Sequence, residues 1–212
     1  MKTVFLGDSI TAGENNNDTS FVDYFLGTTY NLGISGTTIG EYSIYPVDGN
    51  SLLSLINRHR LLIEKADVIF IEYGINDVAS VMCGFVTEQT VIISFIKALD
   101  AIKQINSKAR IIFLTISNAL TIQQKDLISS YGKLQCDYLE NVYFKNFRFN
   151  FPESVWVLTY ISIIKGIQKT GIEMVSIYDD RFVNEFLSDD FIHPNNNGHL
   201  QIAKTLESIF RA

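Results

Sequence analysis

Cysteine and positive charge are both scarce in this chain. The two cysteines, Cys83 and Cys136, form no CxxC motif and no Cys/His ligand spacing, so we expect free thiols and not a disulfide framework or a zinc site. Lys and Arg number 17 against 23 Asp and Glu, which gives a formal charge of −6. No basic excess is available to meet phosphates, so neither nucleic acid nor an anionic membrane surface is an expected partner.

Long hydrophobic runs are missing as well. No stretch approaches the ~18 apolar residues of a membrane-spanning helix, and Val4-Phe5-Leu6 is too short for the apolar part of a leader. We therefore expect no membrane span and, unless a leader has been removed, a cytoplasmic protein. The 212 residues, 47% hydrophobic and 19% charged, predict a single globular domain over residues 1–212.

Short apolar runs alternate along the chain with segments of helical periodicity. The runs are rich in β-branched residues, and the segments between them repeat apolar residues at i, i+3, i+4 and i+7. The predicted strands are Thr3–Leu6, Tyr30–Leu32, Asp67–Glu72, Arg110–Ile116 and Ile172–Tyr178. The predicted helices are Ser51–Lys65, Glu88–Asn106, Val155–Lys169 and Asn197–Phe210. This order predicts an α/β fold, with a five-stranded, mostly parallel sheet covered by helices on both faces.

One segment, residues 117–152, interrupts this alternation. It is predicted to be helical in part, over Gln124–Tyr143, and it carries an unusual number of aromatic side chains: Tyr131, Tyr138, Tyr143, Phe144, Phe147, Phe149 and Phe151. An insertion of this length is typical of a lid, a substrate wall or an oligomer contact, so a homo-oligomer is one expectation. Extra core packing over one edge of the sheet is the alternative.

Candidate reactive groups follow the ends of several predicted strands. The carboxyl ends of parallel strands share one edge of a sheet, where ligands bind. Ser9 follows the first strand, Gly36 the second and Asn76 the third, and Asp190 and His193 come after the fifth. We interpret Ser9 as a nucleophile, His193 as its base, and Asp190 as the acid that orients the imidazole. The backbone N–H groups of Ser9 and Gly36 and the side-chain amide of Asn76 are the candidate oxyanion donors. The pattern predicts a serine hydrolase.

Other residues of the same types fit structural roles better. Of the two remaining histidines, His59 is expected to be a structural residue on a helix, and His199 a surface or capping residue. Asp189 competes with Asp190 as the orienting acid, but the i−3 spacing from the histidine favours Asp190. Asp77 is expected to fix its loop.

These segments match two other kinds of site less well. The glycines at positions 7 and 13 do not form a phosphate-binding loop, because no Lys-Ser/Thr pair follows the second of them. A metal site built from Asp8, Asp190 and His193 is an alternative to the serine chemistry. It lacks further His or Cys ligands, so no metal is expected.

The motifs that carry these residues resemble the four signature blocks of the SGNH (GDSL-like) hydrolases, in the family's order. The blocks are Gly7-Asp8-Ser9, Asn31-Leu32-Gly33-Ile34-Ser35-Gly36-Thr37, Gly74-Ile75-Asn76-Asp77 and Asp190-Phe191-Ile192-His193-Pro194. The resemblance implies a flavodoxin-like, three-layer α/β/α fold, no cofactor, and ester or thioester hydrolysis through an acyl-enzyme. It also supports the roles given to Ser9, Gly36, Asn76, Asp190 and His193. The aromatic insertion is longer than the family core requires.

The substrate class follows less directly from the residues. We expect a small-molecule or carbohydrate ester with a short acyl group, such as an O-acetyl group, because no long apolar channel is evident and aromatic rings can stack on sugars. The alternatives are a lysophospholipase or acyl-thioesterase, an acetyltransferase, and a catalytically idle carbohydrate-binding module.

Overall fold

A five-stranded parallel sheet forms the centre of the computed structural model, which describes residues 1–14, 16, 19–42, 49, 51–116, 153–178, 186–188 and 193–211. The strands run in the order β2-β1-β3-β4-β5. Their bounds are β1 Lys2–Gly7, β2 Thr28–Gly33, β3 Val68–Glu72, β4 Arg110–Thr115 and β5 Glu173–Ser176. Each of these strands overlaps one of the predicted strands, so the five strands are confirmed.

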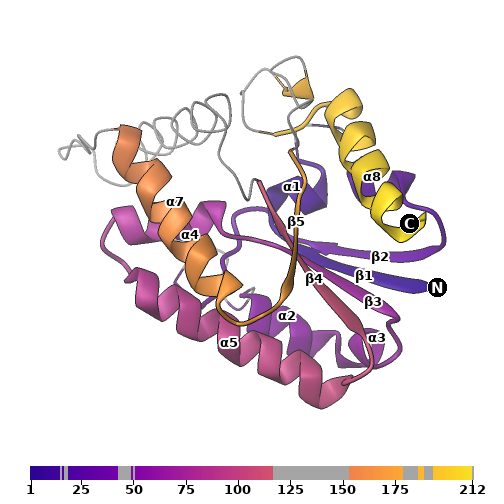
Figure 1. Ribbon diagram of the computed structural model, residues 1–212, viewed down its shortest axis with the longest axis horizontal. Coiled ribbons are helices and arrows are strands. Elements are labelled where there is room, and N and C mark those ends of the chain that lie inside the picture. The colour runs from indigo at the N-terminus through magenta and orange to yellow at the C-terminus, as the bar shows by residue number, and fades with distance from the viewer. Residues whose placement is uncertain are drawn as a thin grey trace.

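Helices cover both faces of the sheet (Figure 1). Their bounds are α1 Ser9–Ala12, η1 Phe21–Tyr24, α2 Leu52–Arg58, α3 Arg60–Glu64, α4 Ile75–Met82, α5 Glu88–Ile105, α7 Glu153–Gln168 and α8 Asn196–Arg211. On one face α5 contacts α2, α3 and α7, and α4 contacts α7; on the other face α8 contacts η1. The predicted three-layer α/β/α architecture is therefore confirmed.

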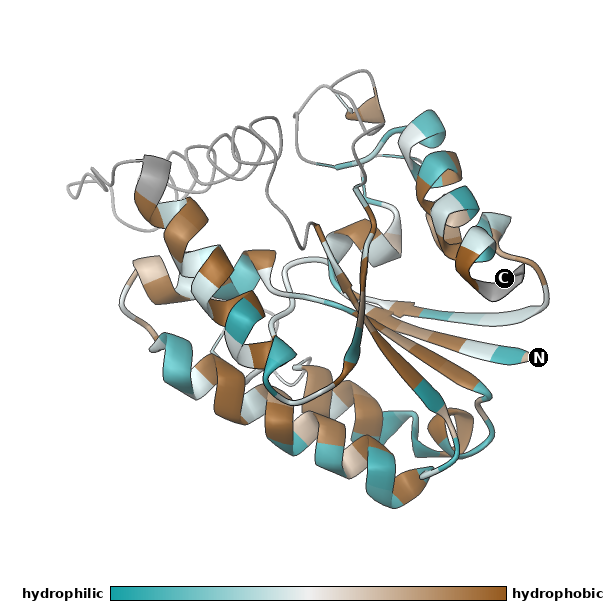
Figure 2. Cartoon of the chain, viewed as in Figure 1, coloured by the Kyte–Doolittle hydropathy of each residue, from teal (hydrophilic) through white to brown (hydrophobic). Residues whose placement is uncertain are grey.

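The hydrophobic core lies on both sides of the central strands. All five residues of β3 are buried, as are the last five of β1, whereas the edge strand β2 is only partly buried; Figure 2 shows the same contrast as brown central strands beside a pale β2. Phe5 stacks on Phe70 at a centroid distance of 4.8 Å, and Phe25 meets both rings edge-on. Burying a side chain of this size contributes roughly 1.5–3 kcal/mol, so this cluster holds η1 firmly to the sheet.

The predicted helix Ser51–Lys65 is wrong in one respect: the chain forms two helices there, α2 and α3. They meet at His59, which ends α2 and precedes α3 with φ −105° and ψ 27°. The helix α4 and the single turn α1 were not predicted as elements. The insertion 117–152 lies outside the described residues, and the single-domain organisation stays a prediction.

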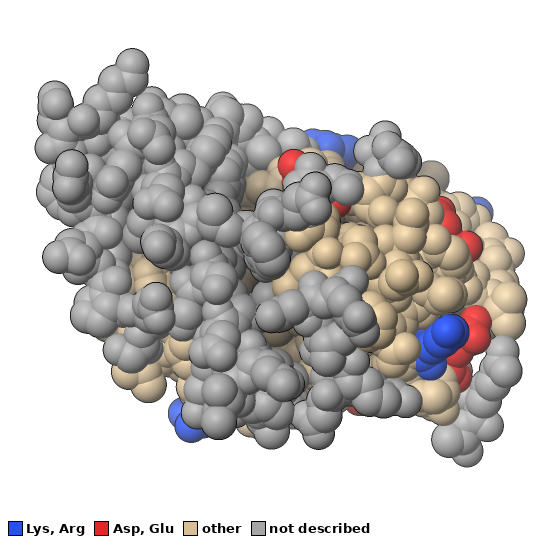
Figure 3. Space-filling model, turned by 90° about the horizontal axis from the view of Figure 1, so that it is seen from above, with Lys and Arg blue, Asp and Glu red and all other residues tan. Residues whose placement is uncertain are grey.

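Two expectations from the composition concern a basic surface patch and a membrane-spanning helix. In the view of Figure 3, the Lys and Arg side chains that are drawn in colour are scattered and do not gather into a patch. Among the helices of the described ranges, none combines the length and the apolar character that a membrane crossing would need.

Candidate active site

The turn that carries Ser9 is held by its neighbours on both sides. Asp8 caps α1, since its Oδ1 accepts a hydrogen bond from the Ile10 N–H at 3.1 Å. Gly13 ends the helix in the left-handed region, with φ 85°, and donates its N–H to the Ser9 carbonyl at 3.0 Å. Gly7 must lack a side chain, because a Cβ there would lie 2.0 Å from the Thr11 Oγ1. Ser9 therefore starts a helix of one turn, directly after β1.

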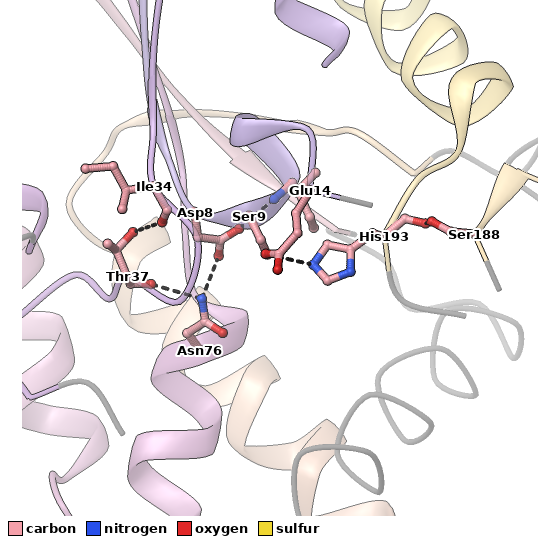
Figure 4. A network of polar contacts seen from close by, with 9 residues as sticks. Asp8, Ser9, Glu14, Ile34, Thr37, Asn76, Ser188 and His193 are labelled. Atoms are coloured by element: carbon pink, nitrogen blue, oxygen red, sulfur yellow. Dashed lines mark hydrogen bonds and ion pairs between the residues drawn. The ribbon is translucent and has the colours of Figure 1, made fainter. Parts of the chain in front are cut away.

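The Ser9 hydroxyl lies against the His193 imidazole. Ser9 Oγ and His193 Nε2 are 2.8 Å apart, a normal hydrogen-bond distance (Figure 4). Ser188 holds the backbone of His193, donating both its N–H (2.8 Å) and its hydroxyl (2.6 Å) to the His193 carbonyl. Asn195 then caps α8, accepting from the Gly198 N–H at 3.1 Å. The structure thus brings the predicted nucleophile and base into direct contact.

Asn76 lies on the other side of the turn that carries Ser9, in the first turn of α4. Its Nδ2 donates to the Thr37 carbonyl at 3.0 Å and to Asp8 Oδ2 at 3.4 Å, and the side chain is buried (Figure 4). Gly36 precedes Thr37 in the turn after β2, with φ 75°, a conformation that favours glycine. The three segments that carry the predicted oxyanion donors therefore meet at one edge of the sheet.

Asp77 fixes this arrangement, as expected from the sequence. Its carboxyl group accepts from the Ile39 N–H at 3.1 Å and from the Tyr42 hydroxyl at 2.9 Å. These bonds tie α4 to the segment that follows Gly36. Burial raises the pKa of Asp77 to about 7, against the lowering effect of these hydrogen bonds.

The orienting acid cannot be placed, because Asp190 and its competitor Asp189 lie outside the described residues. Their roles stay predictions. His193 Nδ1 is the ring nitrogen that such an acid would have to reach, since Nε2 faces Ser9.

Glu14 is a neighbour of the site that the sequence did not indicate. Its Oε2 is 3.9 Å from His193 Nε2, on the same side of the ring as Ser9, and its side chain is 43% exposed. Its backbone N–H donates to the Ser9 carbonyl at 3.0 Å, which places the residue against the turn that carries Ser9. The sequence feature that could have pointed to Glu14 is its position directly after Gly13, which ends the helix that begins at Ser9.

Glu72 is a second such neighbour, and it lies beneath the site. It is buried at the end of β3, where its Oε2 accepts from the Thr11 hydroxyl at 3.0 Å. A charged residue in a buried central strand is rare, so Glu72 at the carboxyl end of β3 could have been noticed in the sequence. The pattern does not show, however, which groups it contacts.

The expectation that His199 lies at the surface is wrong. Its side chain is fully buried in α8, where Nδ1 accepts from the Phe21 N–H at 3.1 Å and the ring stacks on Phe21. Burial, with a smaller effect of His193, lowers the pKa of His199 to about 4. His199 is therefore a neutral structural histidine that joins α8 to η1.

Solved structures of several esterases and lipases share this fold. A lipase from a goat rumen metagenome has a TM-score of 0.60 and 15% identity, covering 98% of this chain and 96% of that chain. A carbohydrate acetylesterase family member from Sinorhizobium meliloti has a TM-score of 0.60 and 13% identity, covering 99% and 97%. A family two carbohydrate esterase from Clostridium thermocellum in complex with cellohexaose has a TM-score of 0.57 and 15% identity, covering 99% and 63%. At these identities the likeness concerns the fold.

Sequence comparison identifies the family. No curated protein sequence matches the chain significantly. The family model described as "GDSL-like Lipase/Acylhydrolase family" matches residues 5–200, nearly the whole chain. The chain therefore belongs to the GDSL-like lipase/acylhydrolase family and is an SGNH-type hydrolase.

Proposed function

We propose that this protein is a serine esterase that removes short acyl groups, with O-acetyl groups on carbohydrates as its substrate class. The observation that carries the proposal is the 2.8 Å contact between Ser9 Oγ and His193 Nε2 at the edge of the sheet where Asn76 also lies. A hydroxyl becomes a nucleophile when a base in hydrogen-bond contact can take its proton.

The first half of the reaction forms an acyl-enzyme. His193 Nε2 takes the Ser9 proton while Oγ attacks the carbonyl carbon of the ester. The carbonyl oxygen becomes an oxyanion, which the Ser9 and Gly36 N–H groups and the Asn76 amide stabilise. Each such donor is worth ~2.7–4 kcal/mol if it resembles a measured one. When the bond between the acyl carbon and the alcohol oxygen breaks, His193 gives its proton to the leaving alcohol.

The second half releases the acid. A water molecule gives a proton to His193 and attacks the acyl carbon, a second oxyanion forms, and the bond to Ser9 Oγ breaks as His193 returns the proton to it. Asp190 is proposed to hold His193 Nδ1–H and so to fix the tautomer that leaves Nε2 free to act as the base.

Two observations support a hydroxyl-rich leaving group. Glu14 lies 3.9 Å from the nitrogen that protonates the leaving alcohol, and its half-exposed carboxylate can accept hydrogen bonds from neighbouring hydroxyls. Structures with the same fold include a carbohydrate acetylesterase family member and a carbohydrate esterase in complex with cellohexaose. The aromatic insertion 117–152 is proposed to supply rings that stack on the sugar.

The experiment combines active-site labelling with a substrate series. The purified protein is treated with a fluorophosphonate probe, and the labelled peptide is mapped in the wild type, S9A and S107A. Ser107 is an exposed serine in the turn before β4, at the opposite edge of the sheet, and serves as the matched control. Rates are then measured on p-nitrophenyl esters from acetate to decanoate, and acetate release is measured on an acetylated oligosaccharide.

We expect the label on Ser9 alone, the highest rate with acetate, and acetate release from the oligosaccharide. A preference for decanoate would replace the carbohydrate esterase with a lysophospholipase or thioesterase. Acyl transfer to an added alcohol without hydrolysis would make the protein an acetyltransferase. Oligosaccharide binding without labelling or turnover would leave an idle binding module and would end the proposal.

A further inference from the structure

Two buried carboxyl groups lie side by side beneath the nucleophile turn. Asp8 follows β1, and Glu72 ends β3, the neighbouring strand, where it pairs in register with Gly7. Asp8 is 0% exposed and Glu72 is 3% exposed. Among the residues that the structure describes, no Lys or Arg forms an ion pair with either carboxyl group, and no cluster that includes them could hold a metal ion.

Charging both carboxyl groups in this position is costly, because burial and mutual repulsion each favour the protonated form. Burial raises the pKa of both groups, and the charge of Glu72 raises the pKa of Asp8 further. Contact between the two side chains raises the pKa of Asp8 and lowers that of Glu72, whereas the Ile10 N–H, which donates to Asp8 Oδ1, acts to lower the pKa of Asp8. The Thr11 hydroxyl also donates to Glu72, which stabilises its charged form.

The protonation of Asp8 matters because Asn76 faces it. In the resting structure the two hydrogens of Asn76 Nδ2 are directed at the Thr37 carbonyl (3.0 Å) and at Asp8 Oδ2 (3.4 Å). A charged Asp8 would hold the second hydrogen tightly and would place a negative charge next to a developing oxyanion. A neutral Asp8 is a weaker acceptor, so the amide can turn to the oxyanion.

We propose that Asp8 and Glu72 share one proton, and that this proton keeps Asp8 uncharged and so leaves the Asn76 amide available to the oxyanion. Glu72 is then a positioning residue, which acts through Asp8 without touching the substrate. The inference rests on the proposed esterase function and on the oxyanion role of Asn76 within it.

Three other titratable groups lie close enough to Asp8 to interact with its charge. Asp77 on α4 and the Tyr73 hydroxyl after β3 lie near enough to interact electrostatically with Asp8. Protonated His193 lowers the pKa of Asp8, so the proton on Asp8 is held most firmly when His193 is neutral and ready to act as a base. The two requirements for activity are therefore met in the same pH range.

The test compares kcat for p-nitrophenyl acetate in the wild type, E72Q and T11V over about pH 6 to pH 10, with the uncatalysed rate subtracted. Loss of the shared proton should end activity at alkaline pH in the wild type. E72Q removes the neighbouring charge, so its alkaline limb should move to lower pH by about one unit or more. T11V removes a donor to Glu72 and leaves the charge in place, so its limb should stay or move to higher pH.

The inference would be overturned if E72Q lowered kcat by the same factor at every pH and left the alkaline limb unmoved. Glu72 would then be a structural residue. A wild type without esterase activity, or an S9A variant that keeps it, would overturn the proposed function instead, so the two failures are distinguishable.

A second measurement does not require E72Q to fold. At the pH where its kcat is highest, the wild-type protein should show the infrared band of a buried protonated carboxyl group. The band should persist in D77N and disappear in D8N, where Asn can still cap α1. A wild-type spectrum without this band would equally overturn the inference.

Discussion

The Glu14 carboxylate approaches His193 at Nε2, the ring nitrogen that also contacts Ser9, and not at Nδ1. It can therefore stabilise the protonated imidazole but cannot serve as the acid that fixes its tautomer. This geometry separates two functions that a carboxylate can have near the proposed base, and it leads to the first prediction.

E14Q should move the acid limb of the pH profile of kcat/KM to lower pH by a few tenths of a unit. A unit charge at 4 Å is worth ~1 kcal/mol in water, and exposure and salt reduce this further. Profiles at low and high salt check the shift, and E64Q, an exposed glutamate on α3, is the control. An acid limb that moves upward would exclude a charge effect of Glu14.

S9A should reduce kcat by at least ~10⁴-fold while leaving the fold intact, because the nucleophile is lost but the side chain contributes little to packing. The rate is measured on p-nitrophenyl acetate, and the fold is checked by the free energy of unfolding in urea. A variant that retained a tenth of the wild-type rate would show that another group performs the attack.

N76A should lower kcat by about 10²–10³-fold with little change in KM, because the amide acts on the charge that develops in the transition state. S80A is the matched control: its hydroxyl bonds the Asn76 carbonyl in the same helix at 3.1 Å, so it perturbs α4 without removing the amide. Equal losses in both variants would mean that Asn76 only shapes the helix.

The H199N variant should make stability less dependent on pH. His199 takes up its proton at about pH 4 in the folded state and near ~6.5 when unfolded, so the unfolded state binds more protons between these values. The wild type should therefore lose up to about 3 kcal/mol through this residue as the pH falls from 7 toward 4. Asn can still accept from the Phe21 N–H. Urea unfolding at about pH 7 and pH 4.5 gives the comparison.

The half-buried His59 provides the control for that measurement. Its pKa is also lowered by burial, but its side chain remains partly exposed, so H59N should change the pH dependence much less. Equal slopes in the wild type and H199N would contradict the assignment of His199 as a buried neutral histidine.

Elements with a strong local signal could be predicted from the sequence. The five strands follow from β-branched apolar runs, and α5 follows from a regular spacing of buried residues. The break at His59 has no Gly or Pro to mark it, and the periodicity continues through it, so one helix was expected where two are found. The single turn α1 is too short to produce a periodic pattern at all.

The same division applies to the site. The proximity of Ser9, Asn76 and His193 was predictable, because each follows a strand at the same edge of a parallel sheet. Glu14, Glu72 and the burial of His199 depend on contacts between segments distant in the chain. The pairing of Glu72 with Asp8, for example, depends on the register of β1 and β3, which a single strand pattern does not contain.

Ser9 and His193, the proposed nucleophile and base, are 184 residues apart in the sequence, and Ser188 holds the backbone of His193 just before α8. A newly synthesised chain therefore carries Ser9 and Asn76 long before it has a base to activate the serine. Because His193 lies next to α8, we expect hydrolysis to begin only after α8 has docked on η1 through His199 and Phe21. Recovery of activity on refolding should therefore report the docking of α8, whereas the formation of secondary structure should report earlier steps.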